Sequence, residues 1–84
     1  GNAMAKRKNF EIRLNGELLA TKHAWNASKR EVEKLVKQVA IKNGATAYNQ
    51  GMCNLEQDDY KCFVKGYYLW ECAGTVYQYW IEQV

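Results

Sequence analysis

Apolar residues recur at every second position from Phe10 to Leu14, which is the period of a half-buried β-strand. Asn-Gly follows at positions 15–16 and favours a type I′ turn, because both turn positions need a positive φ. In that register Ile12 opposes Leu19. The sequence therefore predicts a β-hairpin over residues 9–24. Its expected inner face holds Phe10, Ile12, Leu14 and Leu19, and its expected outer face holds Glu11, Arg13, Leu18, Ala20 and Lys22.

The spacing of apolar residues then changes to three and four, which is typical of an amphipathic helix. Ser28 is the expected N-cap, because Glu31 three residues later completes a capping box. Asn-Gly at positions 43–44 ends the helix, since Gly adopts the left-handed conformation after the C-cap at little cost. A helix this short needs a sheet beneath its apolar stripe. The stripe consists of Val32, Leu35, Val36, Val39 and Ala40.

Residues 60–84 predict a second hairpin with long strands and a turn at Ala-Gly, positions 73–74. A two-residue turn places Tyr67 opposite Trp80. It also places Lys65 opposite Glu82, a favourable charge pair that supports this register. Residues 45–59 have the weakest pattern: positions 46–48 are compatible with a short fifth strand, and positions 49–51 and 56–59 are typical of turn and loop.

These elements predict an α+β domain in the order β-β-α-β-β. Two β-hairpins form one antiparallel sheet of four strands, with a short fifth strand as an option, and the sheet packs against a single amphipathic helix. Eighty-four residues fit one domain. We expect residues 1–3, ahead of Met4, to be a cloning scar, residues 4–8 to be a basic N-terminal arm, and residues 9–84 to form the domain.

The residue types that carry chemistry are few. The three cysteines are an odd number and lack the short spacing of zinc ligands, so we expect free thiols in a reducing compartment. His23 is the only histidine, and no nucleophile or carboxylate pattern accompanies it. We therefore expect a protein that is not an enzyme, with no catalytic residue, cofactor or metal. Without a signal sequence or an apolar membrane span, we expect it in the cytoplasm.

Charge is distributed unevenly along the chain. Residues 1–45 carry ten Lys and Arg against four Asp and Glu, whereas residues 46–84 carry two Lys against five Asp and Glu. A basic arm and helix face can contact phosphates, so nucleic-acid binding is the alternative function. Lys and Arg on an exposed face also serve solubility. The nucleic-acid candidates are Lys6, Arg7, Lys8, Lys29, Arg30, Lys34 and Lys37.

The second hairpin has apolar residues on both faces, and one helix covers only one of them. A contiguous aromatic patch on a soluble protein is typical of a binding surface. The surplus of apolar residues is equally compatible with self-association as a homodimer, with burial under residues 45–59 and with a bulge near Gly66. The partner-binding candidates are Phe63, Tyr67, Leu69, Val76 and Trp80.

The leading hypothesis is a small non-enzymatic binding protein that acts by occupying a macromolecular partner. A protein partner is favoured over a nucleic acid. In general character such a compact domain is similar to the small accessory proteins of bacteriophages and mobile elements, among them anti-CRISPR inhibitors. No residue motif carries that similarity, which implies only an inhibitor-type role.

Overall fold

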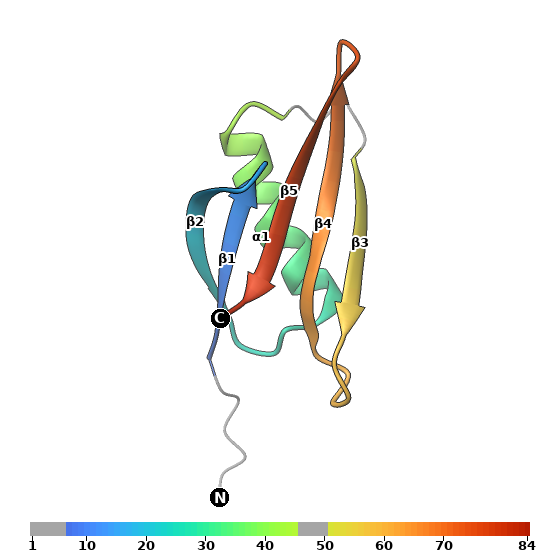
Figure 1. The fold of residues 1–84 in the computed structure, drawn as a ribbon. Helices are drawn as coiled ribbons and strands as arrows, with labels where there is room; N and C mark the ends of the chain where they lie inside the picture. The colour runs from blue at the N-terminus through green and yellow to red at the C-terminus, as the bar shows by residue number, and fades with distance from the viewer. Residues whose placement is uncertain (1–6, 46–50) are drawn as a thin grey trace, which may run out of the picture.

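Five strands form one antiparallel sheet, and a helix covers one of its faces, within residues 7–45 and 51–84, the part of the chain that the computed structural model describes (Figure 1). The elements are β1 Lys8–Leu14, β2 Glu17–Ala24, α1 Lys29–Lys42, β3 Met52–Gln57, β4 Phe63–Cys72 and β5 Thr75–Gln83. Their order across the sheet is β2-β1-β5-β4-β3. The predicted α+β class is confirmed, with strands in the chain order β-β-α-β-β-β.

The β1–β2 hairpin turns at Asn15 and Gly16, whose φ angles are 49° and 92°, as a type I′ turn requires. The predicted register holds next to the turn but is wrong beyond it. A bulge between Ile12 and Arg13 places Ile12 opposite Ala20 instead of Leu19. Strict alternation cannot anticipate the extra residue of a bulge.

The bulge changes which side chains of β2 face the helix. Paired residues of antiparallel strands share a face, so Ala20 lies on the side of Ile12, and Lys22 lies on the side of Phe10. The prediction that Ala20 and Lys22 are on the outer face is therefore wrong. Leu19 remains partly buried against the core, as expected.

The β4–β5 hairpin has the predicted register along its whole length. Its turn uses Ala73 and Gly74 with φ of 50° and 81°. Tyr67 pairs with Trp80, and the pairing continues from Lys65–Glu82 to Cys72–Thr75. Because β5 also pairs with β1, this hairpin is the centre of the sheet.

The first strand of the C-terminal half, β3, lies where the sequence pattern is weakest. β3 pairs with β4 from Met52–Leu69 to Gln57–Phe63, so the prediction of turn and loop is wrong at Glu56 and Gln57. The short strand predicted at positions 46–48 lies outside the described residues. β3 makes the sheet one strand wider than two hairpins.

Helix α1 has the predicted caps and the predicted buried stripe. Ser28 Oγ accepts the Glu31 N–H at 3.2 Å, and the Ser28 N–H donates to Glu31 Oε1 at 3.2 Å, which completes the capping box. At the other end Gly44 has φ of 110°, and the Ala45 N–H donates to the Ala40 carbonyl at 2.9 Å. The core lies between this helix and the sheet, and its largest fully buried side chains are Phe10, Ile12, Val32, Val36, Tyr79 and Ile81.

Candidate functional site

The sheet face that points away from α1 has no covering layer among residues 7–45 and 51–84 (Figure 1). We call it the open face. Strand pairing aligns a row of side chains across it, because opposed residues share a face. From β2 to β3 this row is Leu18, Arg13, Trp80, Tyr67 and Asn54.

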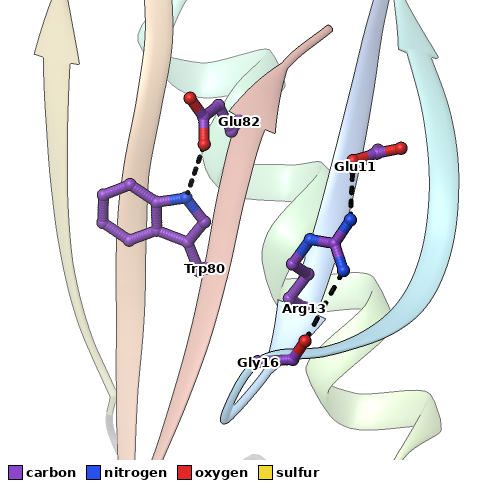
Figure 2. A network of polar contacts seen from close by, with 5 residues as sticks. All are labelled: Glu11, Arg13, Gly16, Trp80 and Glu82. Carbon is purple, nitrogen blue, oxygen red and sulfur yellow. Dashed lines mark hydrogen bonds and ion pairs between the residues drawn. The ribbon is translucent and has the colours of Figure 1, made fainter.

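Two aromatic rings lie at the centre of this row. The rings of Tyr67 and Trp80 are stacked, with centroids 6.4 Å apart and an interplanar angle of 16°. Trp80 Nε1 donates a hydrogen bond to Glu82 Oε1 at 3.1 Å (Figure 2). Asn54 Nδ2 donates to the Tyr67 hydroxyl at 3.2 Å. Polar partners therefore fix both rings, and each ring is only half-buried.

Charged side chains surround the aromatic pair. Arg13 contacts Glu11 at 3.0 Å on the same side of the sheet as Trp80 (Figure 2), and its other nitrogen donates to the Gly16 carbonyl at 3.5 Å. Lys65 lies 3.6 Å from Glu56. By the strand registers, the charged residues on this face of β1, β3, β4 and β5 are four carboxylates and two cations. They are Glu11, Glu56, Glu71 and Glu82 against Arg13 and Lys65.

A hollow opens beside the stacked rings. It has a volume of about 250 Å³ and is lined by Asn54, Glu56, Gly66, Tyr67 and Trp80. A Cβ at Gly66 would collide with the backbone of Asn54 and Leu55, so only Gly allows β3 and β4 to approach this closely. The hollow is smaller than the ~300–1,000 Å³ of small-molecule pockets, and its size fits one long side chain.

The structure brings together four of the five partner-binding candidates. Tyr67, Leu69 and Trp80 are half-buried on the open face, and Val76 is 55 % exposed there. The prediction that Phe63 lies on the outer face is wrong.

Phe63 faces inward because the β3–β4 register shifts between Glu56 and Gln57. It is partly buried against the core, and its N–H donates to the Ala27 carbonyl at 2.8 Å. The apolar part of the open face also includes Met52 and Leu18, which are 62 % and 46 % exposed. The outward position of Leu18 is as predicted. Met52 was not predicted, because it reaches this face through the pairing of β3 with β4, for which the sequence has no local signal.

The basic candidates lie in two places. Lys29, Arg30, Lys34 and Lys37 are all exposed on α1, and three of them line one shallow hollow with Ile41. Lys29 is 3.9 Å from Glu33. Arg7 is exposed and Lys8 begins β1, whereas Lys6 lies outside the described residues.

The remaining chemical groups do not converge on a site within residues 7–45 and 51–84. His23 Nδ1 lies 2.6 Å from Asn9 Oδ1 and is exposed. Cys53, Cys62 and Cys72 are free thiols, and burial raises the pKa of the Cys53 thiol above its ordinary value, an effect that Lys37 partly opposes. No group of three or more His, Cys, Asp or Glu in the described residues could hold a metal ion.

No protein-family model, no curated protein and no solved structure matches this chain. Within the described ranges, no helix has the length and apolar character needed to cross a membrane.

Proposed function

We propose that this protein is a small non-enzymatic binding protein that occupies a macromolecular partner, a protein, through its open face. Its role would be that of an inhibitor-type accessory protein. The observation that carries the proposal is the stacked pair of Tyr67 and Trp80 at the centre of a sheet face that no described element covers.

The composition of the open face supports a partner. A solvated face of an antiparallel sheet ordinarily alternates polar residues with the buried ones. Here four of the eight outward positions in the paired part of β4 and β5 are apolar and lie next to one another, with Gln78 among them and charged residues on either side. The four are Tyr67, Leu69, Val76 and Trp80. Protein interfaces have this arrangement of an apolar, aromatic centre and a polar rim. Trp and Tyr are also the residue types that most often dominate binding energy.

The test is affinity capture from nuclease-treated lysate of cells that make the protein. We expect Trp80→Ala to lose the captured protein while the domain stays folded. Trp25→Ala is the matched control, because Trp25 is 59 % exposed in the loop between β2 and α1 and should retain the captured protein. Equal capture by wild type and Trp80→Ala would rule out the open face as the binding surface.

Nucleic-acid binding through the arm and the helix is the second proposal. It is supported by an exposed hollow on α1, whose lining has three cations, Arg30, Lys34 and Lys37, against one carboxylate, Glu33. Real phosphate contacts make affinity fall steeply with salt. A gel shift with duplex DNA and with RNA across a salt series tests this. The proposal requires a shift at low salt that weakens in Lys34→Glu/Lys37→Glu, and it fails if no shift occurs at low salt.

A further inference from the structure

We infer that the hollow beside Trp80 receives an arginine side chain from a basic segment of the partner protein. This inference rests on the proposed function and names the partner chemistry that the open face fits. It depends on the lining of the hollow, on the charges around it and on an unusual pairing of carboxylates.

The lining offers the two contacts that a guanidinium makes best. Tyr67 and Trp80 present nearly parallel rings, and a planar guanidinium stacks on such faces. Glu56 is at the rim, where its side chain is 63 % exposed and its Oε2 lies 3.6 Å from Lys65 Nζ. An exposed ion pair of this kind contributes little, so an incoming cation can share or replace it.

The surrounding charge selects the sign of the partner. Four carboxylates against two cations on the open face repel phosphate and attract a basic segment. Glu11 and Glu82 are direct cross-strand partners, and like charges in that position are destabilising. Arg13 contacts Glu11, and the Trp80 indole donates a hydrogen bond to Glu82. Neither carboxylate lines the hollow, so this pair adds to the negative charge of the surrounding surface, which attracts a cationic segment.

Arginine fits better than lysine for geometric reasons. Its flat, weakly hydrated head can stack on an aromatic ring and at the same time donate two hydrogen bonds to a carboxylate. A lysine ammonium is a compact, strongly hydrated point charge that gains less from the stack. The volume of about 250 Å³ accommodates one such side chain.

The test is a titration of the ¹⁵N-labelled full chain with capped Gly-Arg-Gly, followed by NMR. We expect saturable shifts of the Trp80 indole and Gly66 amide signals. The same peptide with citrulline, which keeps the shape of arginine and removes its charge, should bind at least several-fold more weakly, and so should the lysine peptide. Glu56→Gln should weaken arginine binding several-fold. Glu71→Gln is the matched control, because Glu71 is on the same face but does not line the hollow.

The inference is overturned if the citrulline or lysine peptide binds as well as the arginine peptide, or if no saturable shift occurs. Shifts that depend on protein concentration alone would assign the face to a second copy of the chain and would also overturn it. These failures are distinguishable from failure of the proposed function. If Trp80→Ala still abolishes partner capture, the open face binds a protein by another chemistry.

Discussion

Ala73 occupies a backbone conformation that suits asparagine better than alanine. It is the first residue of the β4–β5 turn, with φ of 50°, and it is exposed. Asn15 holds the equivalent position of the β1–β2 turn, with φ of 49°, and glycine follows in both turns. The two turns therefore form a matched pair in which Ala73→Asn and Asn15→Ala are reciprocal substitutions.

The expected size of the effect follows from backbone sterics. The left-handed conformation costs an ordinary L-residue roughly 1–2 kcal/mol, whereas Asn adopts it readily. No packing changes at Ala73, because the side chain is exposed. We expect Ala73→Asn to stabilise the domain by about 1 kcal/mol, and Asn15→Ala to destabilise it by a similar amount. A gain of this size raises the melting temperature of a domain of 60–100 residues by about 4–8 °C.

Urea unfolding followed by circular dichroism measures both variants. The midpoints should move in opposite directions while the m-value stays constant, since the surface exposed on unfolding does not change. The double variant should return close to wild type, because the two turns are independent. If Ala73→Asn fails to stabilise, or if both variants move the midpoint the same way, the β4–β5 turn is not type I′. The pairing of Tyr67 with Trp80 would then no longer follow, because it depends on a two-residue turn at Ala73 and Gly74.

Three other predictions concern the two faces of the sheet. Trp80→Ala should cost about 0.5–1.5 kcal/mol of unfolding free energy through the lost ring stack. Ile81→Ala should cost about 2–5 kcal/mol, because Ile81 is fully buried. Equal losses in urea unfolding would mean that Trp80 is part of the core. Burial raises the pKa of Tyr79, so the folded state keeps this proton where the unfolded state releases it. The stability of the wild type should therefore fall as the pH rises above about 10. The urea midpoint of Tyr79→Phe should fall less over the same pH range. An equal decline in both proteins would contradict the assignment of this effect to Tyr79. Iodoacetamide should modify exposed Cys72 before Cys53, whose pKa burial raises, and mass spectrometry showing the reverse order would contradict the placement of β3.

Local signals in the sequence predict much of this fold. Ser28 and Glu31 mark the start of the helix, and the register of the second hairpin follows from its turn and from the Lys65–Glu82 pair. Each of these features is decided within a few residues or across one turn. The bulge beside Ile12 is different, because an inserted residue leaves the composition of the strand unchanged.

Features that depend on distant pairing could not be predicted. β3 has a weak alternation of its own and forms by pairing with β4, so its residues resemble a loop in isolation. Phe63 faces the core because of the irregular pairing at the end of that strand. The surplus of aromatic residues that suggested binding is visible in the sequence, but the hollow beside Trp80 requires Glu56 and Asn54 from β3.

The central claim is that the outward side chains of the β4–β5 hairpin serve binding and the inward ones serve folding. The most direct measurement is the dissociation constant of the captured partner for wild type and for Trp80→Ala. A residue at the centre of the interface should cost about 2 kcal/mol or more, which is roughly a 30-fold weakening, in a variant that still unfolds cooperatively. A change of less than about twofold in such a folded variant would contradict the account, since binding would then not use the open face.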